Sequence, residues 1–239
     1  YVGLSGSNNR LRESSATSYY LEDTMDFGKL AISLGYRSED YEQRHRRWSD
    51  KAGPNLTEVR TGPADVRDTM AYNDHTTSSI AATYDLSATT TLVAGFYEGM
   101  TPMFGADPEE ADNMELGVRY SEGTTNVEAF YFASDYSRLA AECTLVSGAA
   151  CDADESAIFS GGEAEVTGLE LNGSMIVEGD GVSYPISISW TSTDATFKNS
   201  SDSDYFGKVA AGDDLPYIPS KQFSIVAGFV SDSGLRGSA

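Results

Sequence analysis

The chain has 239 residues and a formal net charge of −21, with 16 Lys+Arg against 37 Asp+Glu. So acidic a protein has little with which to neutralise a phosphate backbone, and nucleic-acid binding is excluded. The apolar fraction of 40% is too high for a disordered acidic tail. No run of about eighteen apolar residues exists that could form a transmembrane helix.

Apolar and polar residues alternate at every second position along much of the chain, which predicts β-strands. In one clear case alternate residues from Met114 to Tyr120 share one face, and Glu115, Gly117 and Arg119 lie between them on the other. The segment 126–136 alternates too, but its inner side cannot be assigned. We expect about nine strands, near residues 14–27, 29–39, 70–85, 89–98, 112–121, 125–139, 163–177, 183–197 and 219–230, with the start of a tenth at Leu235.

The connections between these strands alternate between short and long. Short turns are expected near residues 27–29, 85–88, 121–124, 178–181 and 231–234, and long loops lie between them. An up-and-down antiparallel sheet places every second connection at the same end, so one end has only turns and the other only long loops. Transmembrane β-barrels of the bacterial outer membrane have this asymmetry. Soluble sandwiches and jelly rolls mix loop lengths at both ends, so the alternation favours the barrel.

Aromatic residues fall near both ends of the expected strands. They could form the two girdles that bracket the apolar band of a membrane barrel. Aromatic residues also favour strands in general, which is the alternative interpretation. Phe27, Tyr84, Tyr120 and Tyr184 lie beside short turns, and Tyr19, Tyr36, Phe96 and Trp190 lie toward the long loops.

Three segments carry a family resemblance. PEEADNMELGVRYSEGTTNVEAFYFASDYSRL (108–139) resembles a barrel segment of the TonB-dependent outer-membrane receptors, with its Glu-Leu-Gly core and short turn. EVTGLEL (165–171) resembles the strand that follows, and DDLPYIPSKQFSI (213–225) is similar to a loop-to-strand segment of the same receptors. In combination they most resemble the ferric dicitrate receptors.

The resemblance implies an all-β, antiparallel, up-and-down transmembrane barrel of about 22 strands that is plugged by an N-terminal domain. We expect residues 1–239 to be part of one such barrel domain, an internal fragment without the plug and the C-terminal strands. An open sheet of about nine strands would expose two unpaired edges to lipid.

The function that the resemblance implies is TonB-energised uptake of a ferric chelate, ferric citrate or another siderophore, across the bacterial outer membrane. The implied partners are the chelate, the TonB complex through the plug, and outer-membrane lipid and lipopolysaccharide. No cofactor is implied, since iron enters only as part of the transported chelate. The alternatives are a passive outer-membrane channel or adhesin barrel, and a soluble β-sandwich module that binds carbohydrate.

The first long loop, expected over residues 40–69, concentrates basic residues in an acidic chain. Guanidinium groups bind carboxylates through paired hydrogen bonds, which would suit an anionic iron chelate. The alternatives are pairing with acids of the same loop or with lipopolysaccharide phosphates. The candidate ligand-binding residues are Arg44, Arg46, Arg47 and Trp48.

Five polar residues alternate with apolar strand residues and would face the lumen of a barrel. There they could hydrogen-bond to a plug or line a ligand path, or they could simply keep the inner wall wettable. They are Arg37, Glu115, Arg119, Glu170 and Gln222.

The two cysteines, Cys143 and Cys151, flank a short Ser-Gly-Ala stretch in a long loop. A close pair in an extracytoplasmic protein is expected to form a disulfide. A metal site would need His or further Cys nearby, and none is present. No nucleophile elbow, metal motif or phosphate-binding loop occurs, so no enzymatic activity is predicted.

Overall fold

The computed structural model describes residues 9–48, 67–102, 108–142, 158–203 and 207–239. These residues form strands and connections, and none forms a helix, so no helix there could cross a membrane. The strands are β1 (Asn9–Asp26), β2 (Leu30–Trp48), β3 (Arg67–Asp85), β4 (Thr90–Thr101), β5 (Glu109–Glu122), β6 (Thr125–Glu142), β7 (Ile158–Glu178), β8 (Val182–Phe197), β9 (Ser201–Ser203), β10 (Gly207–Val209), β11 (Lys221–Ser231) and β12 (Arg236–Ser238).

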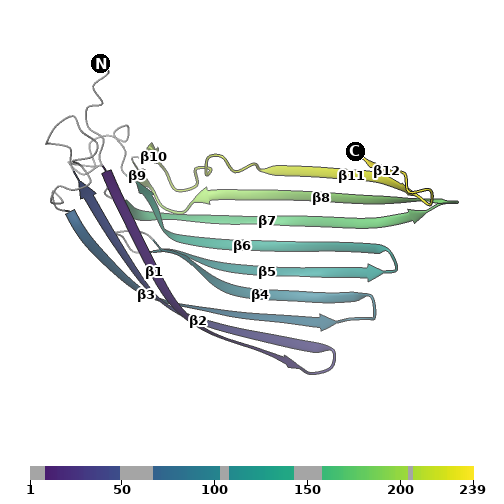
Figure 1. Ribbon diagram of the computed structural model, residues 1–239, viewed down its shortest axis with the longest axis horizontal. Helices are drawn as coiled ribbons and strands as arrows, with labels where there is room; N and C mark the ends of the chain where they lie inside the picture. Colours follow the sequence, from purple (N-terminus) through teal and green to yellow (C-terminus); the bar gives the residue numbers. More distant parts are fainter. Residues whose placement is uncertain (1–8, 49–66, 103–107, 143–157, 204–206) are drawn as a thin grey trace, which may run out of the picture.

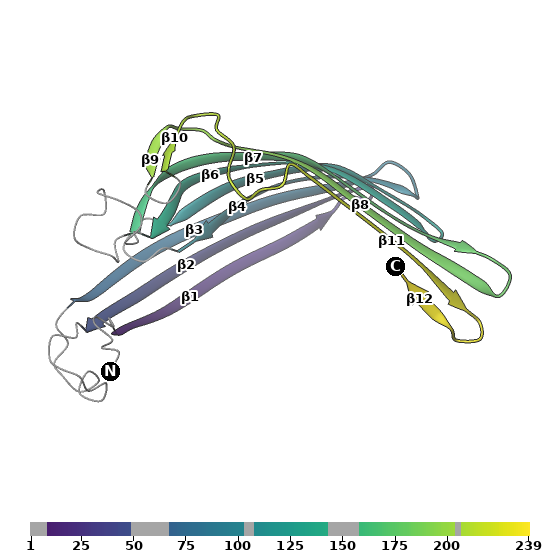
Figure 2. The same cartoon turned by 90° about the horizontal axis from the view of Figure 1, so that it is seen from above.

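Ten of the strands form one antiparallel sheet in the order β1-β2-β3-β4-β5-β6-β7-β8-β11-β12, and β9 and β10 form a separate hairpin. Every neighbour in the large sheet is the next strand of that sheet along the chain (Figure 1). This is the up-and-down topology that the sequence predicts. The sheet is strongly curved when it is seen from above (Figure 2).

Tight turns occupy one end of the sheet and the longer connections occupy the other (Figure 1). Four of the turns use a glycine with positive φ, a conformation that costs glycine little. In the first, Gly28 has φ 80°, and its amide donates to Asp26 Oδ1 at 2.8 Å. The expected alternation of short and long connections is therefore confirmed.

Several strands are longer than predicted, by up to nine residues toward the long connections and by at most one residue toward the turns. β2 continues to Trp48 and β3 begins at Arg67, so the prediction that residues 40–69 form one loop is wrong. The ligand-binding candidates Arg44, Arg46, Arg47 and Trp48 lie in β2. Apolar alternation ends near Glu39, whereas the ladder of backbone hydrogen bonds continues through the polar residues beyond it. The hairpin β9–β10 was not predicted either.

The sheet has two chemically different faces, which the register defines across all neighbouring strands. Apolar residues of successive strands align opposite one another, for example Leu34 with Ile80 and Ile188 with Ile225. Polar residues align on the other side, for example Arg119 with Glu128. The first set, here called the apolar face, includes Leu34, Ile80, Leu116, Leu169, Ile188 and Ile225; the polar face includes Arg37, Ser79, Glu115, Glu128, Glu170 and Ser189.

Very little of this sheet is covered by other parts of the described chain. Its buried apolar residues are Ala164, Ala195 and Phe197, at the long-connection end of β7 and β8. On the apolar face, by contrast, Leu116 is 58% exposed and Ile225 is 55% exposed. A soluble protein rarely leaves so large a contiguous apolar surface in water. The apolar face therefore requires a nonpolar surrounding.

The predicted aromatic residues lie on the apolar face in two rows. Tyr184 and Trp190, both on β8, are six residues apart, which is about 20 Å along a strand at about 3.3 Å per residue. Tyr131 and Phe223 extend the row nearer the long connections, and Phe229 extends the row nearer the turns. This spacing and exposure match the interfacial girdles of a membrane barrel.

Candidate functional site

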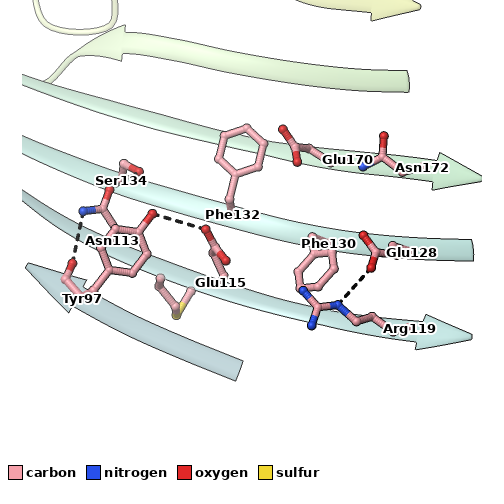
Figure 3. A pocket seen from close by; sticks show the side chains of 11 residues that line it. Tyr97, Asn113, Glu115, Arg119, Glu128, Phe130, Phe132, Ser134, Glu170 and Asn172 are labelled. Carbon is pink, nitrogen blue, oxygen red and sulfur yellow. Dashed lines mark hydrogen bonds and ion pairs between the residues drawn. The ribbon is translucent and has the colours of Figure 1, made fainter. Parts of the chain in front are cut away.

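The polar face carries a hollow of about 380 Å³ that crosses β4, β5, β6 and β7 (Figure 3). Side chains from four consecutive strands reach it because residues that face one another across an antiparallel ladder share a face. It contains carboxylates, a guanidinium, amides and aromatic rings. Its lining residues are Tyr97, Asn113, Met114, Glu115, Arg119, Glu128, Phe130, Phe132, Ser134, Glu170 and Asn172.

Asn113 anchors one end of the hollow and is only 8% exposed. Its Nδ2 donates to the backbone oxygens of Tyr97 (3.1 Å) and Ala111 (3.3 Å), and its Oδ1 accepts from Ser134 Oγ at 2.8 Å. Both ends of the amide are therefore satisfied, as a buried amide requires. These bonds join β4, β5 and β6 through one side chain.

Two phenyl rings of β6 lie across glycines of the neighbouring strands. Phe130 is opposite Gly117 of β5, and Phe132 is opposite Gly168 of β7. The rings occupy the space where a Cβ at either glycine would lie. Figure 3 shows the two rings directed to opposite sides of β6. Paired with glycine, a large ring can lie flat on a face that is otherwise polar.

The charges of the hollow are unequal in number. The Arg119 guanidinium is 3.1 Å from Glu128 Oε1 and lies 5.3 Å from the centre of the Phe130 ring. Glu115 Oε1 accepts from the Tyr97 hydroxyl at 3.3 Å. Glu170 adds a third carboxylate to the same lining (Figure 3). Three carboxylates facing one guanidinium leave a negative excess, which suits a cationic partner.

Of the five residues predicted to face a lumen, the structure brings three together in this hollow: Glu115, Arg119 and Glu170. Arg37 is on the same face but on β2, where it forms an ion pair with Glu39 (2.6 Å) and donates to Ser18 Oγ at 3.0 Å. Gln222 is also on that face but on β11, opposite Thr191.

Sequence reasoning missed the contribution of β6, because Glu128, Phe130 and Phe132 share a face and mix charge with aromatic character. The structure assigns that face to the polar side, with Val127, Ala129 and Tyr131 on the apolar side. The signal that could have resolved it is the pair of glycines in the adjacent strands, since a face opposite glycine can hold rings without an apolar surrounding.

At the long-connection end, Lys198 Nζ contacts Asp135 Oδ1 at 2.7 Å and so links the end of β8 to β6. This hydrogen bond to a carboxylate raises the pKa of Lys198. Within the described residues no group of three or more His, Cys, Asp or Glu is arranged to hold a metal ion. The predicted disulfide partners, Cys143 and Cys151, lie outside the described residues.

Comparison with known proteins identifies the architecture. The family model described as TonB dependent receptor-like, beta-barrel matches residues 1–237. No curated protein matches the chain.

Solved structures with a similar fold include the alcaligin outer-membrane receptor FauA from Bordetella pertussis, at TM-score 0.65 and 19% identity, covering 92% of this chain and 35% of that one. The ferric citrate transporter FecA has TM-score 0.66 and 19% identity, with coverage of 93% and 31%. The ferric-catecholate import receptor Fiu from E. coli K12 has TM-score 0.69 and 16% identity, with coverage of 92% and 33%. This chain thus spans about a third of the length of the structures that it matches.

Proposed function

The chain belongs to the TonB dependent receptor-like β-barrel family, and we propose that it forms part of the wall of an outer-membrane receptor that takes up a ferric chelate with energy from TonB. The observation that carries this proposal is the family match across residues 1–237. The two-faced, up-and-down sheet supports it, because an apolar band bracketed by aromatic rows is what a barrel wall presents to lipid.

In this proposal the ten-stranded sheet is one arc of a larger closed barrel. Two edge strands, β1 and β12, have neighbours on one side only within the described sheet. Unpaired backbone groups at such edges would be costly in lipid. Matched structures about three times as long supply a precedent for further strands that close the wall.

The polar face then lines the lumen and contacts a plug domain or the passing ligand. The negative excess of Glu115, Glu128 and Glu170 over Arg119 suits basic or amide groups of a plug. The plug would be the element on which the TonB complex acts. Arg37 and Gln222, on the same face, would extend this lining toward β2 and β11.

The proposed substrate class is a ferric chelate, ferric citrate or another siderophore. This proposal is supported by the ligands named for proteins of similar fold, which include a ferric citrate transporter and a ferric-catecholate import receptor. The proposed capture residues are Arg44, Arg46, Arg47 and Trp48 at the far end of β2. Iron would enter as part of the cargo, and no chemical step is required of the protein.

The other candidates fit the observations less well. A soluble carbohydrate-binding sandwich would cover the apolar face with a second sheet, whereas within the described residues Leu116 and Ile225 are more than half exposed. A passive channel or an adhesin barrel would share the wall but would not depend on TonB.

The test uses the full-length protein in its native host under iron limitation. Deleting the gene should abolish growth on one ferric chelate and uptake of radioactive iron from that chelate. Deleting tonB should give the same loss. A plasmid that carries the receptor gene should restore growth and uptake after the receptor gene is deleted, but not after tonB is deleted. Uptake that persists without TonB would favour the passive channel, and uptake that is unaffected by deleting the gene would refute the proposal.

A further inference from the structure

The ladder of backbone hydrogen bonds between β3 and β4 ends well before the two strands do. β3 begins at Arg67, but its pairing with β4 covers only Ser79 to Asp85, so residues 67–78 pair only with β2 among the described strands. Residues 98–101 of β4 pair only with β5. Figure 2 shows β1, β2 and β3 continuing together beyond the end of β4. The two segments that part here, 67–78 and 98–101, are called the fork.

The fork begins at the border of the apolar band. Ile80 and Phe96 form the last apolar pair of the β3–β4 ladder, and Phe96 belongs to the aromatic row nearer the long connections. Beyond it, Ser78, Thr76 and Asp74 take the positions of β3 that are in phase with the apolar face. In the proposed function the fork therefore lies outside the hydrocarbon, where unpaired backbone groups can bind water.

The edge of β3 in the fork is open to another strand. The Ser78 amide points toward β4, because it donates to the Glu98 carboxylate at 2.7 Å. In an antiparallel strand every second residue directs its N–H and C=O to the same side, so Thr76 and Asp74 present theirs to the fork. No described strand pairs with them on that side. Such an open row of donors and acceptors is a template for the addition of a strand from another polypeptide.

Both rims of the fork carry unbalanced acids at positions in phase with the apolar face. Asp40 on β2 is directly opposite Asp74 on β3, and Glu98 on β4 is directly opposite Asp112 on β5. All four residues are exposed, and none of the described ion pairs includes any of them. Like charges that face each other across strands destabilise a sheet. Cations supplied by a partner would relieve this repulsion.

The polar-face side of the fork is different, because its charges already have partners. It holds a hollow of about 340 Å³ to which Arg37, Glu39 and His75 contribute. Arg37 forms an ion pair with Glu39 at 2.6 Å. His75 Nδ1 lies 3.8 Å from Glu110 Oε1, which accepts from Arg138 at 2.6 Å. This side therefore has room for small side chains but no comparable demand for cations.

We propose that the fork binds an extended segment of another protein, which adds antiparallel to the edge of β3 and carries Lys or Arg at every second position. Side chains of an added strand alternate between the two faces. Those on the outer side lie beside the carboxylates of Asp74 and Glu98, which select cations. Those on the inner side enter the hollow, which selects small uncharged residues. The inference rests on the proposed function only in placing the fork outside the bilayer.

The probe is a fluorescent peptide of about eight residues in which Thr and Lys alternate, titrated into the full-length protein in detergent. Wild type should bind it, and the amides of Asp74 and Thr76 should exchange hydrogen about 10-fold more slowly in the complex. A peptide with Glu in place of Lys should not bind. Exchange is measured by mass spectrometry and binding by fluorescence anisotropy.

N-methylated peptides test the hydrogen bonds of the added strand. Residues directly opposite each other in an antiparallel pair share a face, so the Lys residues lie opposite Thr76 and Asp74 and direct their amides to β3. N-methylation of the Lys residues should weaken binding about 30-fold or more, because it removes these donors. N-methylation of the Thr residues, whose amides point away from β3, should leave the affinity within about 3-fold.

The charge requirement is tested with the double variant Asp74→Asn/Glu98→Gln, in which Gln keeps an acceptor for Ser78. It should bind the Thr-Lys peptide about 10-fold or more weakly. Glu163→Gln/Asp194→Asn, which removes two acids at the same end of β7 and β8, is the matched control and should stay within about 3-fold of wild type. Heat-dependent gel mobility verifies that both variants are folded, and the methylated peptides require only wild type.

Several outcomes would overturn the proposal. These are absence of binding to wild type, equal losses for the two methylated peptides, and unchanged exchange at Thr76 in the complex. Equal losses in the two double variants would do so as well, because the peptide would then be attracted to the acidic chain as a whole. Failure of the proposed function is separate, since peptide binding is measured without a chelate and iron uptake is measured in the host.

Discussion

Glycine has a specific structural role at two positions of the polar face. Gly117 and Gly168 each lie under a phenyl ring of β6. The rings cover the glycine backbone and line the hollow beside its carboxylates. Residue choice on one strand is thus determined by the neighbouring strand.

Replacing Gly117 by Ala should destabilise the sheet by about 1–3 kcal/mol, because the added Cβ meets the Phe130 ring and lies 2.7 Å from the backbone oxygen of Ala129. Gly99→Ala is the matched control, since a Cβ there has no neighbour closer than 3.7 Å. Urea midpoints of the refolded full-length protein in detergent measure both. Equal midpoints for the two variants would contradict the role of the ring.

Asn113 provides a second prediction at this scale. Asn113→Ala should cost about 1–3 kcal/mol, because it removes the buried amide whose hydrogen bonds hold the backbone oxygen of Tyr97 and the hydroxyl of Ser134. Asn172→Ala, at an exposed position of the same hollow, should change stability by less than about 0.5 kcal/mol. If Asn113→Ala lowered the free energy of unfolding no more than Asn172→Ala, the hydrogen bonds of Asn113 would not stabilise the sheet.

At the scale of elements, the sheet divides between β3 and β4. Their pairing ends at Ser79 and Tyr97, although β3 continues to Arg67 and β4 to Thr101. At the point of division the Glu98 carboxylate accepts from the Ser78 amide (2.7 Å) and hydroxyl (2.8 Å). A side chain thus replaces the backbone acceptor that a continued ladder would supply.

Glu98→Ala should therefore extend the region in which β3 and β4 are not paired. Without its acceptor, the Ser78 amide should exchange hydrogen about 10-fold faster, and Thr77 should follow, as for a lost hydrogen bond of about 1.4 kcal/mol. Asp112→Ala, opposite Glu98 in the β4–β5 register, is the control and should leave both amides protected. Hydrogen exchange of the peptide around Ser78, measured by mass spectrometry, tests this prediction. Unchanged hydrogen exchange in Glu98→Ala would mean that the Glu98 carboxylate does not protect the Ser78 amide.

On the scale of the whole molecule, the sequence predicted the topology well and the site only in part. Period-2 alternation and glycine turns are local signals, and they located the ten strands of the sheet. The sequence did not predict the far part of β2. Beyond the apolar band no membrane contact requires apolar and polar residues to alternate, although the strand continues through Arg44 to Trp48. The sequence predicted only some of the residues of the hollow. Glu115 and Arg119 alternate with apolar neighbours, so their face could be assigned. Glu128 and Phe130 share a face that can be assigned only from the neighbouring strand.

The division of the molecule into two faces makes a final prediction, with adjacent residues of β8 as its test. Ile188 is on the apolar face between the aromatic rows, and Ser189 is on the polar face. Ile188→Arg should destabilise the protein in bilayers by about 2–4 kcal/mol, because it places a cation in hydrocarbon. Ser189→Arg should cost less than about 1 kcal/mol, since its side chain enters a wet wall lined by Asn172 and Ser224. Denaturant titration of both variants and the wild type in phospholipid vesicles measures the difference in free energy of unfolding. A larger cost at Ser189 would reverse the assignment of the two faces and, with it, the membrane orientation on which the proposed receptor function depends.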